Sequence, residues 1–155
     1  MAGQQPTMRT GTPDDPPPAR VVVVDNQHFV RERTSGYLAR EPAFEVVGGA
    51  ATGAQGIAVC RRLRPDLVVL DVGLPDMSGI DVATALRALP RSPLILMQSG
   101  TRDPYIVWGA LQAGARGYVD KAAAPGELVS ALQAVLRGES PVLRGVTLPA
   151  HGDGG

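Results

Sequence analysis

Polar side chains that could bind a metal ion or a phosphoryl group stand at the ends of several short apolar runs. They are Asp25 and Asn26 after VVVV, Asp71 after LVVL, Ser99 at the end of LILMQS, and Lys121 shortly after GYV. Carboxylate and amide oxygens suit a hard cation such as Mg²⁺. A lysine ammonium suits a phosphoryl oxygen, and a hydroxyl can donate to the same group. Together these are the groups needed to place a phosphoryl group on a carboxylate.

Five short apolar runs, each bounded by Pro, Gly or charged residues, predict buried β-strands. They are residues 21–25, 44–48, 67–71, 94–98 and 117–119. In a parallel sheet, ligands bind at the carboxyl ends of the strands. The polar side chains at the strand ends are therefore expected to meet at one edge of the sheet.

Between these runs the apolar residues follow helical spacing, which predicts a helix after each strand. The spacing is carried by Phe29, Val30, Arg33, Tyr37 and Leu38; by Ile57, Cys60 and Leu63; by Val82, Leu86 and Leu89; by Ile106, Ala110 and Leu111; and by Leu128, Leu132, Val135 and Leu136. Pro104 and Pro125 suit helix first turns, and Gly138 suits a helix end. Five βα units in succession predict an α/β fold, a doubly wound sandwich with a parallel sheet covered on both faces.

The bulk composition limits the class of protein. The chain has 155 residues, 44% of them hydrophobic, which is enough for one domain with a packed core. Lys plus Arg equals Asp plus Glu at 15 each, so direct binding to nucleic acid or to an anionic membrane is not expected. The single Cys60 excludes an internal disulfide. No apolar signal core or membrane span is evident, and a cytoplasmic protein is expected.

The two ends of the chain differ in composition from its centre. Residues 1–18 are rich in Pro, Gly, Thr and charge and predict a disordered Pro-rich tail. Residues 140–155 predict a flexible C-terminal tail, with one apolar patch at 142–148 that could dock. The folded domain is expected to occupy residues 19–139.

Each strand-end residue also has a structural explanation. An Asp after a strand is often the N-cap of the next helix, and this reading stays open for Asp25 and Asp71 taken singly. Agreement among four strand ends favours a shared site, provided that the strands are assigned correctly.

Three segments of the sequence resemble bacterial response-regulator receiver domains of the NarL/FixJ-like branch. DLVVLDVGLPDMSGID at 66–81 resembles the phospho-acceptor segment, and EVVGGAATGAQGIAV at 45–59 resembles the second strand and helix. GARGYVDKAAAPGELVSALQAVLRGE at 114–139 resembles the fifth strand, the lysine and the last helix. The resemblance covers residues 20 to 139. It implies a flavodoxin-like (βα)5 fold with strand order 2-1-3-4-5.

The resemblance implies a signalling module that is phosphorylated on Asp71, rather than an enzyme acting on other substrates. The phosphoryl group would come from a sensor histidine kinase or a small phosphodonor. Mg²⁺ would be bound by Asp71, by Asp25 and Asn26 after the first strand, and by the backbone carbonyl of Gly73. Lys121 would contact the phosphoryl oxygens.

Ser99 and Tyr118 occupy the switch positions that the resemblance implies. Ser99 would move toward the new phosphate, and Tyr118 would turn into the space that Ser99 leaves. The surface that changes would be formed by the fourth helix, the fifth strand and the fifth helix. That surface would bind a downstream protein or a second copy of the chain. The charge added by the phosphoryl group would shift the surface between two packing states.

The sequence departs from the family pattern at two points. The family usually has two adjacent acids after the first strand, and here the second is Asn26. One unit charge at about 4 Å in an effective dielectric of about 20 is worth at most roughly 4 kcal/mol, so weaker Mg²⁺ binding is expected. Members of the branch also usually carry a C-terminal helix-turn-helix domain, which is not expected in this chain.

Two rival functions remain. A pseudo-receiver would keep the fold as an unphosphorylated protein-interaction module, and Asn26 favours it, whereas Asp71, Ser99 and Lys121 argue against it. A small α/β enzyme or nucleotide binder ranks last, because GGAATGAQG at 48–56 lacks the order of glycines and lysine of a phosphate loop. His28 is expected on the surface of a helix start. Trp108 is open between partial burial and partner contact.

Overall fold

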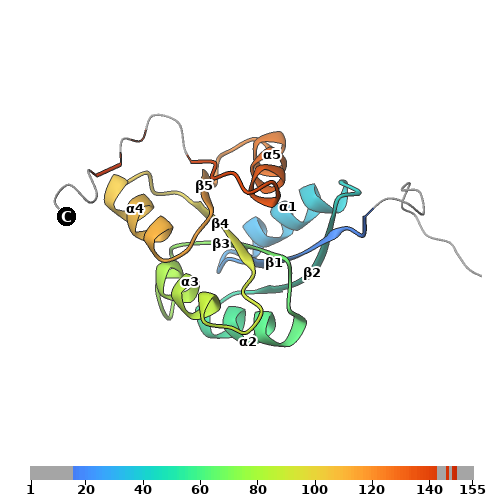
Figure 1. Ribbon diagram of the computed structural model, residues 1–155, viewed down its shortest axis with the longest axis horizontal. Helices are drawn as coiled ribbons and strands as arrows, with labels where there is room; N and C mark the ends of the chain where they lie inside the picture. The colour runs from blue at the N-terminus through green and yellow to red at the C-terminus, as the bar shows by residue number, and fades with distance from the viewer. Residues whose placement is uncertain (1–15, 143–145, 147, 150–155) are drawn as a thin grey trace, which may run out of the picture.

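Strands and helices alternate along the chain in the computed structural model, which describes residues 16–142, 146 and 148–149 (Figure 1). In chain order the elements are β1 (Ala19–Val24), α1 (His28–Ala39), β2 (Phe44–Ala50), α2 (Gly53–Leu63), β3 (Leu67–Leu70), α3 (Gly79–Arg87), β4 (Leu94–Ser99), α4 (Pro104–Gln112), β5 (Gly117–Asp120) and α5 (Pro125–Leu136). The predicted alternation of strand and helix is confirmed.

The strands form one parallel sheet in the order β2-β1-β3-β4-β5, as predicted. β1 lies between β2 and β3, with Val24 opposite Leu70 of β3. The strand β2 runs to Ala50, beyond the predicted end at residue 48, because Gly48 and Gly49 pair with Val22 and Val23 of β1. The central position of β1 places its carboxyl end between two neighbouring strands.

Helices cover both faces of the sheet, so the core has two layers. α1 and α5 pack on one face, against Val21 and Val23 of β1. α2, α3 and α4 pack on the other face, against Val22 and Val24. Figure 1 shows α1 and α5 on one side of the strands and α2 and α3 on the other. The four valines are 0–1% exposed. Burial on both faces explains why this strand is an unbroken apolar run.

The apolar face predicted for α1 was partly wrong. Phe29 is 70% exposed, whereas the buried residues of this helix are Val30, Thr34 and Leu38. These three residues are spaced by four and therefore lie on one face of the helix. Phe29 precedes this stripe by one residue and points elsewhere, with the Arg33 guanidinium 5.6 Å from the centre of its ring.

The predicted helix ends hold for the last two helices. Pro104 and Pro125 are the first residues of α4 and α5. Gly138, just after α5, has a φ of +88°, a conformation that glycine adopts without strain. Most of the predicted tails lies outside the described residues. In the described part of the chain, no helix is long and apolar enough to cross a membrane.

Candidate functional site

The two aspartates at the strand ends lie side by side. Asp25 follows β1, Asp71 follows β3, and the Asp71 amide donates to the carbonyl of Val24 over 2.9 Å. Both residues are almost fully buried, with Asp25 2% and Asp71 4% exposed. Parallel pairing of β1 with β3 therefore brings together two carboxylates that stand 46 residues apart in the sequence.

Lys121 reaches these carboxylates from the loop that follows the edge strand β5. Its amide donates to the carbonyl of Ser99 over 2.9 Å, which fixes the start of the β5–α5 loop. Its Nζ atom lies 2.9 Å from Asp71 Oδ2 and 2.9 Å from Asp25 Oδ2. Nζ also donates to Gln27 Oε1 over 2.9 Å. The ammonium thus bridges both acids, as the convergence of strand ends predicted.

Burial and charge shift the titration of this cluster. Burial raises the pKa of Asp71, and the nearby Asp25 charge adds to the rise, while hydrogen bonds from Lys121 and the Gly73 amide oppose it. Burial by itself would lower the pKa of Lys121. The hydrogen bonds and charges of Asp25 and Asp71 have the larger effect and raise this pKa above its ordinary value. A lysine held charged between two acids is therefore the main local counter-charge.

The loop after Asp71 folds back tightly on the strand end. Gly73 donates its N–H to Asp71 Oδ1 over 3.2 Å and forms an antiparallel bridge with Ser78. The Gly79 amide donates to the Val72 carbonyl over 2.7 Å. A Cβ at Gly79 would collide with the backbone carbonyl of Asp71. This glycine of the quoted LPDMSG segment is therefore required by a close backbone approach.

The two predicted switch residues are joined through Thr101 in the β4–α4 loop. Ser99 is 4% exposed and Tyr118 is 0% exposed, so the tyrosine ring lies inside the protein. The Tyr118 hydroxyl donates to the Thr101 carbonyl over 2.9 Å, and the Thr101 amide donates to Ser99 Oγ over 3.2 Å. Burial raises the pKa of Tyr118, and a hydrogen bond with Ser99 partly offsets this rise.

The turn after β1 presents Asn26 to solvent. Asn26 is exposed beside the buried Asp25. The next residue, Gln27, donates its N–H to Asp25 Oδ1 over 2.8 Å while its side chain accepts from Lys121. Gln27 was not predicted as a site residue, because an amide at a helix start is unremarkable in sequence. Gln27 therefore contacts both Asp25 and Lys121 of the cluster.

Two arginines of α1 support the same cluster through the backbone. Arg31 Nη1 donates to the Asp25 carbonyl over 2.7 Å. Arg33 Nη2 donates to the Lys121 carbonyl over 3.0 Å. Helix α1 thus holds the two loops that carry Asp25 and Lys121, and this role was also missed from the sequence.

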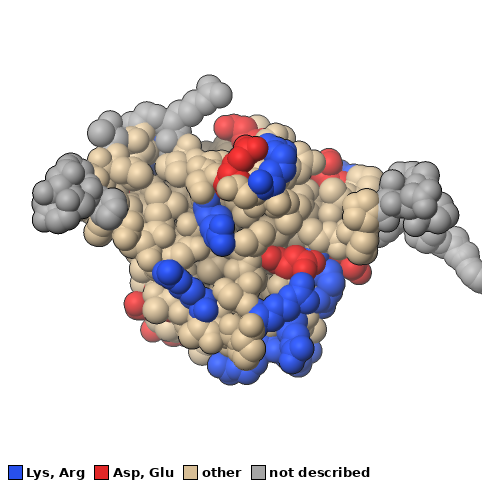
Figure 2. Space-filling model, viewed as in Figure 1, with Lys and Arg blue, Asp and Glu red and all other residues tan. Residues whose placement is uncertain are grey.

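The remaining candidates lie in different environments. Cys60 is buried in the core, and burial raises the pKa of its thiol to about 12. His28 begins α1 and is exposed, and Trp108 is half-buried on α4. Figure 2 shows basic side chains gathered where Figure 1 places α2, and the exposed Arg61 and Arg62 belong to that helix.

The glycine-rich segment 48–56 binds a carboxylate of the protein itself. Asp76 accepts hydrogen bonds from the N–H groups of Gly53 and Ala54, over 2.7 and 2.9 Å. The Thr52 side chain accepts from the Gln55 N–H over 3.1 Å. These amides at the start of α2 are the ones that an anion would need. Because Asp76 already takes two of them, the segment is a capped helix start, in line with the sequence interpretation.

The cluster offers oxygen ligands suited to a small divalent cation. Asp25 Oδ2 and Asp71 Oδ2 both face the Lys121 ammonium, each 2.9 Å from Nζ. No group of three or more His, Cys, Asp or Glu residues in the described part could hold a metal. Two carboxylates with a backbone or amide oxygen fit Mg²⁺, which keeps several of its waters. They do not fit a cation that needs a full protein cage.

Comparison with known proteins agrees with this geometry. The family described as the response regulator receiver domain matches residues 21–133. The chain belongs to the response regulator receiver domain family, and its relatives are NarL- and LuxR-family response regulators of two-component systems.

Individual relatives give the extent of the likeness. Over 115 residues the chain is 36% identical to the uncharacterized transcriptional regulatory protein YhcZ of Bacillus subtilis, covering 74% of this chain and 53% of that protein. Over 122 residues it is 34% identical to the response regulator protein VraR of Staphylococcus aureus, covering 78% and 58%. The chain therefore spans little more than half the length of these curated relatives.

Solved structures show the same likeness. The signal receiver domain of the putative response regulator NarL from Mycobacterium tuberculosis superposes with a TM-score of 0.77 and 34% identity, covering 80% of this chain and all of that one. A LuxR-family two-component response regulator from Aurantimonas superposes with a TM-score of 0.76 and 34% identity, covering 80% and 89%. Both the fold and the predicted branch are confirmed.

Proposed function

We propose that this receiver domain accepts a phosphoryl group on Asp71 and signals through a changed protein surface. The observation that carries the proposal is the cluster at the carboxyl end of β3. The Asp71 carboxylate is 4% exposed, lies next to Asp25 through parallel pairing of β1 and β3, and is 2.9 Å from the Lys121 ammonium. A carboxylate next to a fixed cation is suited to receive a phosphoryl group.

The chemistry follows from the roles of these groups. An ionised oxygen of Asp71 attacks phosphorus in line, a P–O bond forms, and the bond from phosphorus to the donor breaks. The donor leaves with the electron pair of that bond; when it is a phosphohistidine of a sensor kinase, its imidazole becomes protonated. Lys121 compensates the negative charge that moves onto the site, because its Nζ already contacts Asp71.

A Mg²⁺ ion would be held by Asp25, Asp71, the Asn26 side-chain oxygen and the Gly73 carbonyl. When bound, it supplies charge neutralisation and alignment of the incoming phosphoryl group. Asn26 contributes no formal charge, so the protein supplies two negative charges here rather than the family's usual three. The weaker field is the main expected difference from other family members.

Phosphorylation would be read out at Ser99 and Tyr118. At present Ser99 Oγ accepts a hydrogen bond from the Thr101 amide over 3.2 Å. A phosphoryl group on Asp71 would draw Ser99 Oγ away from that amide. Thr101 also binds the Tyr118 hydroxyl. The β4–α4 loop would then repack, and the α4–β5–α5 face would change. The partners proposed for this face are a downstream protein and a second copy of the chain.

A second candidate function is that of an unphosphorylated pseudo-receiver. The observation that favours it is Asn26, which is exposed where a second acid would stand. Lys121 also bridges Asp25 and Asp71 directly, and a weakly charged site would leave that bridge intact. In this case the domain would bind its partner in one state only.

Intact-mass measurement separates the two candidates. The chain is incubated with acetyl phosphate in two parallel samples, one with Mg²⁺ and one with a chelator. Asp71→Asn is the control for the site, and Asp66→Asn, which changes an acid at the opposite end of β3, is the control for the substitution itself. Gain of one phosphoryl group that needs both Mg²⁺ and Asp71 supports the receiver function. If no phosphoryl group is gained at any Mg²⁺ concentration, the result supports the pseudo-receiver function instead.

A further inference from the structure

The chain returns to the sheet after α5 and lies along the outer edge of β5. Gly138, with a φ of +88°, turns the backbone at the end of the helix. The Pro141 carbonyl then accepts a hydrogen bond from the Tyr118 N–H over 2.9 Å. Val142 forms an isolated parallel bridge with Tyr118. Residues 141–142 thus pair with a strand whose other edge already pairs with β4.

The residue that starts β5 is shaped for this contact. A Cβ at Gly117 would lie 2.6 Å from the Pro141 carbonyl oxygen, and 3.0 Å from both Pro141 Cγ and Leu96 Cδ1 of β4. Any side chain at this position would therefore push the returning segment away. The absence of a side chain at Gly117 is explained by the close approach of Pro141.

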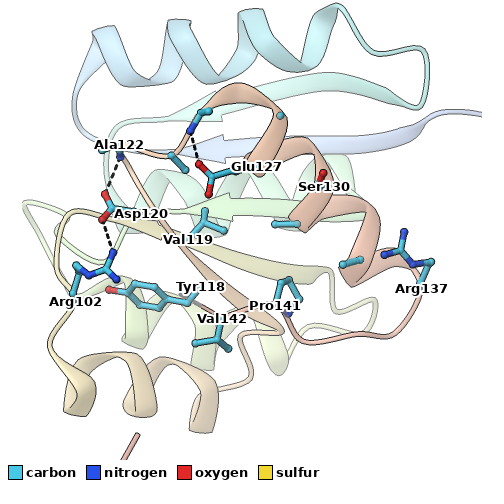
Figure 3. A pocket seen from close by; sticks show the side chains of 15 residues that line it. Arg102, Tyr118, Val119, Asp120, Ala122, Glu127, Ser130, Arg137, Pro141 and Val142 are labelled. Carbon is cyan, nitrogen blue, oxygen red and sulfur yellow. Dashed lines mark hydrogen bonds and ion pairs between the residues drawn. The ribbon is translucent and has the colours of Figure 1, made fainter. Parts of the chain in front are cut away.

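Apolar side chains beyond the bridge hold the segment down. Val142, Val146 and Leu148 are half-buried and pack against the core cluster that includes Tyr118. Figure 3 shows Val142 beside the Tyr118 ring, with Pro141 and Arg137 toward one end of a groove along β5 and α5. The other end of the groove holds the Arg102–Asp120 ion pair, at 3.2 Å. The groove has a volume of about 1000 Å³.

We propose that residues 141–142 form a strap, an intrachain occupant of the outer edge of β5, which must leave before another chain can pair with that edge. The occupant is this chain's own segment because it is already seated there, and only four residues separate Pro141 from Leu136, the last residue of α5. So short a tether gives a high effective concentration, which a free partner must overcome.

The strap is tied to the residue that the proposed switch uses. Tyr118 donates its N–H to Pro141 and its hydroxyl to Thr101. One residue therefore connects the strap with the β4–α4 loop. The inference concerns the face that the proposed function assigns to output, but the strap itself does not depend on phosphorylation. Its test uses the unphosphorylated chain, so it can fail independently of the proposed function.

Amide hydrogen exchange tests whether the strap is seated. In the 155-residue chain the Tyr118 amide should be protected, and Gly117→Ala should speed its exchange by about tenfold or more, because the strap is displaced. Amides of Leu128 and Leu132 in α5 should be unchanged, which excludes general unfolding. Gly126→Ala is the matched control, since a Cβ there meets no atom within 4 Å. Equal Tyr118 exchange in wild type and Gly117→Ala would overturn the proposal.

A peptide of residues 139–149 added in trans tests the identity of the occupant. Val142→Asp weakens the strap but leaves β5 intact, so this variant should bind the labelled peptide at least about tenfold more tightly than the wild-type chain does. The double variant with Gly117→Ala should not bind it, because the added Cβ occupies the place of Pro141. Equal peptide binding by wild type and Val142→Asp would contradict an intrachain occupant.

Discussion

The Nζ atom of Lys121 lies 2.9 Å from Oδ2 of Asp71, across 50 residues of sequence. The same ammonium lies 2.9 Å from Asp25 Oδ2. Both carboxylates are almost fully buried, so this one cation offsets two charges that have little contact with water. The arrangement makes stability and the proposed phosphorylation depend on the same three side chains.

Replacing Lys121 by Met should lower the free energy of unfolding at pH 7 by about 1–3 kcal/mol, since two buried acids then face each other unpaired. The loss should shrink as the pH falls, because Asp71, whose pKa is raised, takes up a proton first. Urea unfolding at pH 7 and pH 4 measures both values. Arg137→Met is the control, because its partner Glu139 and the arginine itself are exposed on the surface. A loss of equal size at both pH values would contradict the paired-acid explanation.

Asp71→Asn should stabilise the protein at pH 7 by roughly 1–2 kcal/mol, because burial disfavours the charged form of Asp71. The raised pKa means that the folded state holds this proton more tightly than the unfolded state does. Its contribution to stability is therefore fully present below the ordinary pKa of 3.8 and is lost as the pH rises through the folded-state pKa. Wild type and Asp71→Asn should converge in urea unfolding below that pH. A variant less stable than wild type at pH 7 would be inconsistent with this sign.

Asp76→Asn should show the opposite pH dependence. Hydrogen bonds from the Ala54 and Gly53 amides lower the pKa of Asp76. The stability that its carboxylate contributes is present above the ordinary pKa of 3.8 and is lost as the pH falls through the lower folded-state value. The variant should unfold at a lower urea concentration at pH 7, and the Gly53 and Ala54 amides should exchange faster. Unchanged exchange at these two amides would exclude the capping role.

Gly79→Ala should destabilise the protein by about 1–3 kcal/mol, because its Cβ would collide with the Asp71 carbonyl. The collision should also move the acceptor, so phosphorylation by acetyl phosphate should slow. Gly126→Ala in α5 is the control, as a Cβ there meets no atom within 4 Å and the residue is not part of the proposed site. Thermal unfolding and the phosphorylation rate of the two variants are compared. Equal behaviour would show that backbone contact at Gly79 is unimportant.

Asn26→Asp should tighten Mg²⁺ binding by about tenfold or more, since it restores one unit charge beside Asp25. Isothermal titration with Mg²⁺ measures the affinity without any phosphodonor. His28→Asp adds the same charge at a nearby exposed position and is expected to have a smaller effect. An Asn26→Asp affinity equal to that of wild type would mean that this position is not a ligand.

The fold could be predicted from the sequence because its strands are short, apolar and separated by helical spacing. The positions of Asp25, Asp71 and Lys121 followed from the rule that parallel strands end at one edge, and the structure brings these three side chains into contact. Ser99 and Tyr118 are also brought together, because both form hydrogen bonds with Thr101. The metal and phosphate roles of these residues stay predictions.

Other features depend on details that no pattern carries. Phe29 was placed on the buried face because it is apolar, whereas that face of α1 in fact carries the polar Thr34 between Val30 and Leu38. Gln27 reaches Lys121, 94 residues away, through a side-chain conformation set by the turn after β1. The pairing of Pro141 with Tyr118 involves a segment too short to show any periodicity.

Mapping of the phosphorylated residue tests the central claim most directly. The chain is treated with acetyl phosphate and Mg²⁺, reduced with borohydride, digested and analysed by mass spectrometry, because borohydride reduces an acyl phosphate to an alcohol and leaves a free carboxylate unchanged. The peptide that contains Asp71 should carry the reduced residue at that position, and Asp71→Asn should yield no reduced residue. Reduction at another acid, or an unmodified Asp71 at saturating Mg²⁺, would contradict the assignment of Asp71 as the phosphoryl acceptor.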